Sequence, residues 1–458
     1  MASAAEQMAA NMSWEAFGKA TELRQRILFT IGLLIIYRIG TYIPVPGIDA
    51  GALKDFMEQA QQGIGGMLTM FTGGALARMG LFALGIMPYI SASIIVQLMT
   101  SLVPALEQLK KEGEQGRKKI NQYTRYGTVL LATFQAVALA KSLEAGSLVT
   151  QGGLFFEAGA VLSLVGGTMF LMWLGEQITA RGIGNGVSLI IFVGIVAQIP
   201  AAIARFLSQG RSGAISPAVI ILVIVMVFAV IAFVVFMERA LRKVHIQYPR
   251  RQVGMKVYDG GSSHLPIKVN PAGVIPAIFA SALLLLPTTI STFSSGTSGP
   301  IMSTILAYFG PGQPLYLIFY AAMTIFFTFF YTKEVSFKVD EVADNLKNQN
   351  GFIPGIRPGK KTAEYLDYVV TRLLVVGSAY LAAVVLLPSI LRSQFAIPFY
   401  FGGTSVLIVV SVTMDTINQV QSHLLAHQYE GLIEKSQLRG GGGKRRSGKA
   451  RRKGPVRK

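Results

Sequence analysis

The stretch MGLFALGIMPYISASIIVQLMTSLVPAL, residues 79–106, runs for 28 residues without an acidic or basic side chain. A helix needs about 20 apolar residues to cross a bilayer, so this length predicts a membrane-spanning segment. A glycine-punctuated apolar run, 63–77, comes directly before it. A short run that cannot span, followed by a span with polar side chains, indicates a pore wall beside a movable element. The small or polar residues of the span are Pro88, Ser91, Ser93, Gln97 and Thr100.

The composition of the whole chain indicates a membrane protein that crosses the bilayer many times. Of its 458 residues, 52% are hydrophobic and 14% are charged, whereas soluble proteins average about 25% charged residues. Its 49 glycines suit the close helix packing that holds membrane proteins together. There is no cysteine, which excludes disulfides and thiol chemistry, and the four histidines lie outside the apolar runs. We therefore expect no metal or other cofactor.

Hydropathy predicts an all-α protein with ten membrane spans. The first span is interrupted by Arg38, and the third has a polar start that must face protein, headgroups or water. The expected spans are 24–43, 76–104, 120–140, 154–177, 184–206, 214–237, 269–293, 310–332, 365–391 and 400–423.

Basic residues are concentrated in alternate loops. Segment 105–125 holds six basic residues against three acids, and segment 238–268 holds seven against two. The tail after Gly443 holds nine basic residues and no acid, whereas 44–75 has one lysine. Because positively charged loops stay in the cytoplasm, both termini and the basic loops are predicted to face it.

Two of these basic loops are unusually long, 238–268 and 333–364. In the first, Val and Tyr residues between Gly and Pro predict a hairpin. Both loops are open to two interpretations: a topology signal that contacts anionic lipids, or a docking surface for a partner. The low-complexity tail, 440–458, is predicted to be disordered and to bind RNA or lipid, or to serve as a topology anchor.

The sequence contains no recognisable catalytic centre. HExxH, GxSxG, a P-loop and paired aspartates within a span are all missing, which excludes intramembrane proteases and ATPases. Glu176, at the end of the fourth span, is expected to pair with Arg181 at the level of the lipid headgroups. We do not expect an enzyme.

Isoleucines surround the proline-broken parts of the second and seventh spans. A small-molecule transporter would need polar or charged ligands at the bilayer midplane, and these positions offer Ile86, Ile90, Ile275 and Ile278 instead. Branched apolar side chains at a constriction exclude water and ions, but the same spacing is ordinary helix packing. A membrane scaffold without a pore is a third alternative, although it does not need a glycine-flanked segment before a proline-broken helix.

Seven strings, in the same order along the chain, resemble the SecY family, the channel subunits of the bacterial protein-conducting translocon. They cover nearly the whole chain and leave out only the basic tail. The strings are YRIGTYIPVPGID (37–49), MFTGGALARMGLFALGIMPYISASIIVQL (70–98), KKEGEQGRKKINQYTRYGT (110–128), GTMFLMWLGEQITARGIGNGVSLIIF (167–192), LPIKVNPAGVIPAIFASALLLLP (265–287), NGFIPGIRPGKKTAEYLDYVVTRL (350–373) and PFYFGGTSVLIVVSVTMDT (398–416).

The resemblance implies two pseudo-symmetric five-helix halves, 24–210 and 211–439, after a cytoplasmic segment 1–23. It implies a pore ring of apolar side chains between them. Val187, one methylene smaller than isoleucine, implies a slightly looser seal at its position. The pore ring is Ile86, Ile90, Val187, Ile191, Ile278 and Ile408.

The same resemblance implies two moving parts, a plug and a lateral gate. The plug would be a short helix, 65–72, and the lateral gate would lie between the second and seventh spans. The plug residues are Gly65, Gly66, Met67, Leu68, Thr69, Met70, Phe71 and Thr72, and the gate residues are Ser91, Ser93, Gln97 and Pro276.

The resemblance also implies partners, and a transport function in which the protein breaks no covalent bond. Unfolded secretory polypeptides would be moved across the bacterial inner membrane, and transmembrane segments released into it. The motor ATPase SecA or the ribosome would drive this transport, with SecE and SecG as small membrane subunits. Signal peptides and nascent polypeptides would be the cargo. Arg357 is implied to dock SecA and the ribosome, and Arg250 and Arg251 to contact ribosomal RNA, since the arginine fork suits phosphate.

Overall fold

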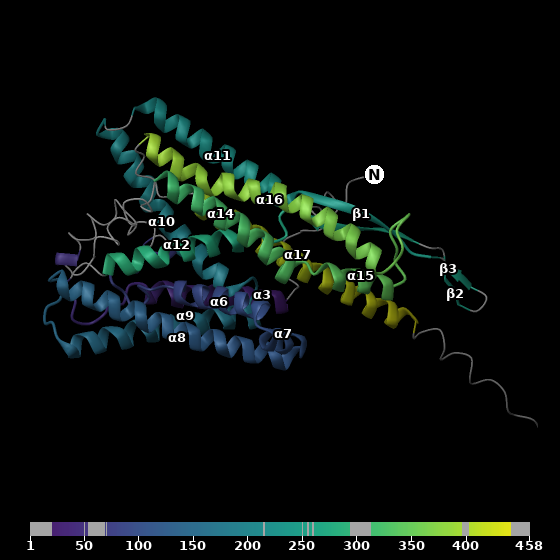
Figure 1. The fold of residues 1–458 in the computed structure, drawn as a ribbon, viewed down its shortest axis with the longest axis horizontal. Helices are drawn as coiled ribbons and strands as arrows, with labels where there is room; N and C mark the ends of the chain where they lie inside the picture. The colour runs from purple at the N-terminus through teal and green to yellow at the C-terminus, as the bar shows by residue number, and fades with distance from the viewer. Residues whose placement is uncertain are drawn as a thin grey trace, which may run out of the picture.

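The computed structural model describes residues 21–49, 51–53, 69, 71–213, 216–249, 251–253, 256–258, 261–293, 313–395 and 403–440. Figure 1 shows an elongated bundle in which α3, α6, α8 and α9 lie on one side and α11, α14 and α16 on the other. Helices α10, α12 and α17 lie between the two groups, since α12 contacts both α6 and α14 and α17 contacts both α3 and α16.

The first group of helices carries most of the first predicted half. Each apolar helix begins at a glycine or proline or shortly after one, where the chain can change direction. The helices of the first predicted half, with α7 and α10 included, have the bounds α3 Thr21–Gly40, α6 Met87–Leu102, α7 Pro104–Lys111, α8 Glu114–Ala145, α9 Leu154–Arg181 and α10 Gly186–Arg211.

The second group carries the long loops as well as helices. A π-helical turn, η1, and a short amphipathic helix, α15, follow directly after α14. The bounds are α11 Pro217–Arg239, β1 Leu241–Gln247, β2 Arg251–Val253, β3 Lys256–Tyr258, β4 Ser262–Lys268, α12 Ile275–Phe293, α14 Pro314–Tyr331, η1 Thr332–Ser336, α15 Val339–Asn348, α16 Lys360–Phe395 and α17 Gly403–Gly440.

Each of the ten predicted spans overlaps one of these helices. Within the described residues, six helical segments are long and apolar enough to cross a bilayer, namely α8, α9, α10, α11, α16 and the segment Pro314–Asn348. The bent pair α6 and α7 would be a seventh. The protein is therefore mostly helical with several membrane-spanning helices, and the number ten stays a prediction.

The second predicted span, 76–104, is not a single helix in the structure. Residues 72–86 form turns, with positive φ angles at Met79 (45°) and Gly85 (58°). α6 begins only at Met87, with Pro88 in its first turn, and the chain bends by 97° before α7. Proline lacks an N–H and suits a first turn, so Pro88 and Pro104 mark helix starts. The turn segment satisfies its backbone by pairing with the chain after α3: Leu81 donates to Ile43 (2.8 Å).

A close approach of this turn segment to α9 depends on Gly167. A Cβ at Gly167 would overlap the carbonyl oxygen of Leu81, whereas a Cβ at the neighbouring Gly166 would meet nothing within 4 Å. Packing of small residues is what brings membrane helices together, and here it brings an irregular segment against a helix.

Gly167→Ala is therefore expected to destabilise the protein by about 1–3 kcal/mol, as overpacking does. Gly166→Ala is the matched control, because alanine in an open helix position gains about 0.5–1 kcal/mol over glycine. Thermal unfolding of the purified protein in detergent measures both. Equal melting temperatures for the two variants would contradict this close approach.

The predicted hairpin in the loop 238–268 is confirmed. β1 and β4 pair antiparallel over seven residues each, with His245 opposite His264, and β2 and β3 form a second pair at the tip. Val244, Ile246 and Ile267 are buried on one face of the β1–β4 pair. The alternation of buried and exposed residues along β1 is what fixes this register.

Candidate pore constriction, plug and gate

The side chains of the predicted pore ring lie in one hydrophobic cluster. Ile86 directly precedes α6, Ile90 lies in its first turn, and the others come from α10, α12 and α17. Exposure ranges from 0% for Ile408 to 6% for Ile278, and Val187 is partly buried against the same cluster. Branched apolar side chains from both predicted halves thus belong to one buried cluster.

The described end of the predicted plug lies in the same cluster. Thr69 and Phe71 are helical, and the amide of Gly74 donates to the carbonyl of Thr69 (2.9 Å). Gly73 has a φ angle of +64°, so the helix ends with a left-handed glycine in a Schellman-type cap. Phe71 is a buried member of the cluster that contains the pore ring. Thr72 is also described, whereas Gly65, Gly66, Met67, Leu68 and Met70 lie outside the described residues.

Arg38, which interrupts the first predicted span, contacts the end of the plug. Its Nη1 donates to the carbonyl oxygen of Gly73 (2.7 Å), and its Nη2 donates to the Tyr42 hydroxyl (3.1 Å). Arg78 lies over the ring of Tyr42, 4.0 Å from its centre. Sequence reasoning missed this contact, although a charge within a span was the available signal.

The predicted lateral gate is an interface between α6 and α12, which contact each other. Ser91 is buried, and Gln97 donates from Nε2 to Ser93 Oγ (3.3 Å). The Oε1 atom of Gln97 is buried and has no hydrogen-bond partner within the described part of the chain. Pro276 is buried in the first turn of α12.

The prediction that Glu176 pairs with Arg181 is wrong. Glu176 pairs with Arg125 of α8 instead. Arg125 Nη2 lies 2.6 Å from Glu176 Oε2, and Arg125 Nε lies 3.2 Å from Oε1. Arg181 is five positions further along α9, where the helical turn directs it to another face. The two-point contact instead joins α8 to α9 and gives the polar start of the third span a protein partner.

The two long loops form one structure, the loop platform, made of β1, β4, α15 and the segment 351–359. Gln247 and Phe352 exchange two backbone hydrogen bonds of 2.9 Å, which extends the hairpin by a bridge to the second loop. The apolar residues of the platform form their own cluster with the start of α16. Its buried members are Val244, Ile246, Ile267, Leu346, Ile353, Leu366, Val370 and Leu374.

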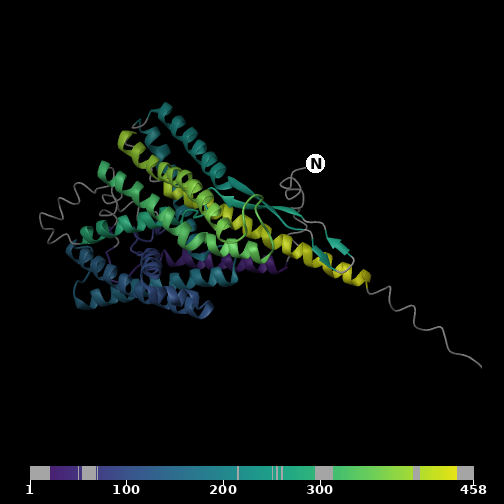
Figure 2. The ribbon, with the colours of Figure 1, turned by 45° about the vertical axis from the view of Figure 1, so that its right-hand side comes forward.

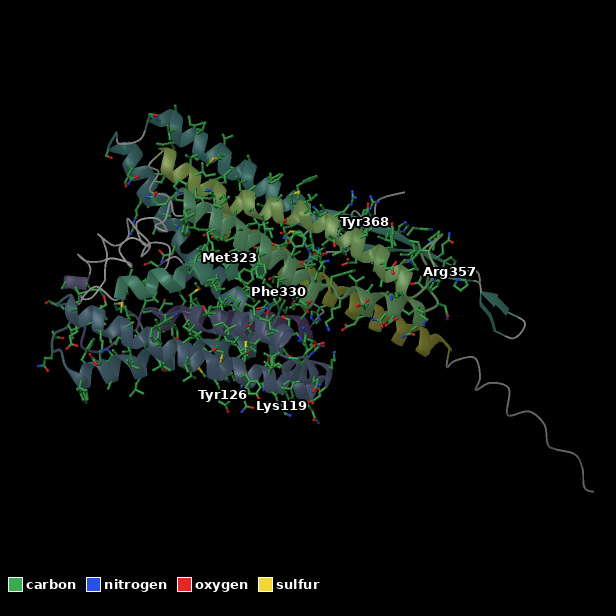
Figure 3. The ribbon with its side chains drawn as sticks, in the orientation of Figure 1. Lys119, Tyr126, Met323, Phe330, Arg357 and Tyr368 are labelled. Atoms are coloured by element: carbon green, nitrogen blue, oxygen red, sulfur yellow. The ribbon has the colours of Figure 1, made fainter. Side chains whose placement is uncertain are left out.

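Arg357 is exposed on this platform, at the end of the molecule where Figure 3 labels it. Gly355 and Gly359 have positive φ angles (82° and 96°), and Thr362 donates to the Arg357 carbonyl (3.0 Å). The bond from Thr362 ties the loop that carries Arg357 to the first turn of α16. Arg251 begins β2, and Arg250 lies outside the described residues.

The basic segments of the described chain gather at one end. Figures 1 and 2 show α7, α15 and the β-strands toward the same end of the bundle, and Figure 3 labels Arg357 and Lys119 toward it. Loops that are basic in alternation are expected to lie on one side of the membrane, and the arrangement of these segments agrees with that expectation.

Comparisons with known proteins agree on one family. The SecY family model matches residues 80–417. The protein translocase subunit SecY of Escherichia coli (strain K12) is 54% identical over 432 residues, covering 93% of this chain and 97% of that protein. Its counterpart from Rickettsia typhi is 51% identical over 425 residues, covering 92% of this chain and 98% of that protein.

Solved structures show the same fold at low sequence identity. A protein-conducting channel matches with a TM-score of 0.62 at 19% identity, covering 88% of this chain and 92% of that chain. Sec61 from a canine ribosome-channel complex matches with a TM-score of 0.61 at 18% identity and the same coverage. The resemblance in the sequence is thus confirmed, and this chain belongs to the SecY family.

Proposed function

We propose that this chain is a protein-conducting channel that moves unfolded polypeptides across a membrane. The observation that carries the proposal is the convergence of Ile86, Ile90, Ile191, Ile278 and Ile408 in one buried cluster. Such a constriction excludes ions because it offers water too few hydrogen bonds. Relatives named as protein translocase subunits support the same function.

The channel opens in two directions in this proposal. A signal peptide, an apolar helix with a basic start, enters between α6 and α12 and partitions partly into lipid. The plug, 65–72, then leaves the constriction, and an extended chain threads the pore ring. Transmembrane segments pass sideways through the same gate into the membrane.

The chain breaks no covalent bond in this mechanism, so it is a channel and not an enzyme. Energy and direction come from SecA or from the translating ribosome, which dock on the loop platform through Arg357, Arg250 and Arg251. SecE and SecG complete the complex. Canine Sec61 and yeast Ssh1, which share this fold, are described in complexes with ribosomes, which supports the ribosome as a partner.

The chain resides in the bacterial inner membrane with both termini in the cytoplasm. The gathering of basic segments at one end supports this orientation. Anionic lipids would contact the exposed Lys111 of α7, and the basic tail would reach RNA or lipid.

Transport of a preprotein into sealed vesicles tests the proposal. Vesicles carrying this chain with SecE and SecG are expected to protect a radiolabelled preprotein from external protease when SecA and ATP are present. The matched control is the same preprotein with charged residues in its signal helix, which is expected to stay accessible. Absence of protected preprotein, with the complex shown to be assembled, would contradict the function.

A further inference from the structure

We propose that His245 and His264 together bind one divalent transition metal ion on the exposed face of the β1–β4 hairpin. Neither residue is among the pore ring, plug, gate and docking residues named so far, and the inference does not depend on the proposed channel function. The expectation of no metal came from the sequence, in which the two histidines lie far apart. The strand register brings them directly opposite each other.

The hairpin holds the two histidines at a position where cross-strand side chains lie closest. Tyr248 donates its amide to the Gly261 carbonyl (3.0 Å), which makes these two residues a hydrogen-bonded pair at the end of the ladder. Hydrogen-bonded and non-hydrogen-bonded pairs alternate along antiparallel strands. Three positions further along the ladder, His245 and His264 are therefore a non-hydrogen-bonded pair. Side chains in such pairs are closer than in hydrogen-bonded pairs, so both imidazoles can reach one ion.

The distance between the two rings is the one that a shared metal ion needs. The ring centres of His245 and His264 lie 5.1 Å apart, and the ring planes are inclined by 57°. An imidazole nitrogen binds Zn²⁺ at about 2.0–2.1 Å, which puts each ring centre about 3.2 Å from the metal and two tetrahedrally arranged rings about 5 Å apart. Rotation of the side chains can therefore aim both nitrogens at one ion while the strands stay where they are.

The surroundings of the pair determine which ions it takes. Both histidines are exposed, and within the described part of the chain neither side chain has a hydrogen bond or an ion pair. No group of three or more His, Cys, Asp or Glu ligands occurs among the described residues, so water completes the coordination. Imidazole prefers Zn²⁺, Cu²⁺ and Ni²⁺, whereas Mg²⁺ and Ca²⁺ prefer oxygen ligands. Lys243 lies on the same face and opposes a cation, so the site is weaker than a four-ligand zinc centre.

The rest of the hairpin keeps the pair in place before a metal binds. Val244, Ile246 and Ile267 are buried on the opposite face, and Gln247 and Phe352 exchange backbone hydrogen bonds at the outer edge of β1. The metal then links β1 to β4 across the strands. Because the ion binds the paired strands and not the separated ones, it stabilises the hairpin within the loop platform.

Zinc binding to the purified full-length protein, prepared without a polyhistidine tag, tests the proposal by calorimetry. His423 and His427 lie four positions apart on α17, a spacing that can also hold zinc, so every protein carries His423→Asn and His427→Asn. In this background, His245→Asn is expected to weaken Zn²⁺ binding about ten-fold or more, at least the loss that follows from changes around a metal ligand.

The companion variants test whether the two histidines act as one site. His264→Asn is expected to cause the same loss as His245→Asn, and combining them is expected to add little, because either change removes the shared ion. Equal binding by the background protein and by both single variants would overturn the proposal. Losses that add up in the combined variant would also overturn it, since they indicate two separate single-histidine sites. Unchanged thermal unfolding without metal shows that the variants fold.

Amide hydrogen exchange shows where the metal acts. Zn²⁺ at ten times its dissociation constant is expected to slow exchange in 241–247 and 262–268 about ten-fold, because opening of the hairpin then requires release of the ion. The same zinc concentration is expected to leave exchange in these segments unchanged in His245→Asn. Equal exchange with and without Zn²⁺ in the background protein, or slowing that persists in His245→Asn, would place the bound zinc elsewhere and overturn the inference.

Discussion

Ile408→Asn is expected to raise the resting ion conductance of the reconstituted channel by about ten-fold or more, since such a polar group changes local hydration by several kcal/mol. Ile408 is fully buried in the cluster of the predicted pore ring, on α17, which packs against α10. An amide at this position gives water the hydrogen bonds that isoleucine withholds, so the constriction fills with water. Planar bilayer recordings without cargo measure the effect.

The control for this variant is Ile417→Asn, on the same helix. Ile417 is 43% exposed, so the same substitution there leaves the constriction unchanged. Ile408→Asn is also expected to admit preproteins with weakened signals, because a less stable closed state needs less signal binding to open. Equal resting conductance in both variants would exclude Ile408 from the seal.

Arg357→Glu is expected to abolish SecA-driven transport while the channel still inserts into the membrane. Arg357 is exposed between Pro354 and Pro358, whose rings restrict the backbone, and Thr362 donates a hydrogen bond to its carbonyl. A loop fixed in this way presents one guanidinium group in a constant position, and charge reversal turns attraction into repulsion. Like charges brought together across an interface cost several kcal/mol, enough to reduce docking more than a hundred-fold.

SecA binding and preprotein transport should be measured together for this variant. Lys360→Glu is the matched control, because Lys360 is exposed three positions away at the start of α16. It should reduce transport only mildly, by the general loss of positive charge. Normal transport by Arg357→Glu would remove Arg357 from the docking surface.

The sequence could locate the helices, because hydropathy depends on side-chain composition alone. It could not show that 72–86 forms turns, since this segment is as apolar as α6. The turns depend on contacts remote in sequence, such as the pairing of Leu81 with Ile43 and the close approach to Gly167. Proline at position 88 was the local signal, because the residue before a proline disfavours helix.

The candidate site, too, divides into features that the sequence could predict and features that it could not. Periodicity could not separate a pore ring from ordinary packing, because both bury isoleucines, and only the resemblance to the SecY family selected the six positions. Ring function itself stays a prediction. The partners of Arg38 and Glu176 come from other elements, 35 and 51 positions away, which no local pattern reports.

The bridge between Gln247 and Phe352 has a mechanical consequence. Since β1 leaves α11 directly and β4 leads toward α12, a push on the Arg357 loop is transmitted through shared strand pairing to both helices. The buried side chains of α16 in the same cluster make this unit stiff. If a motor docks at Arg357 as proposed, its pull would therefore reach the start of α12, at the proposed gate, through the same strand pairing.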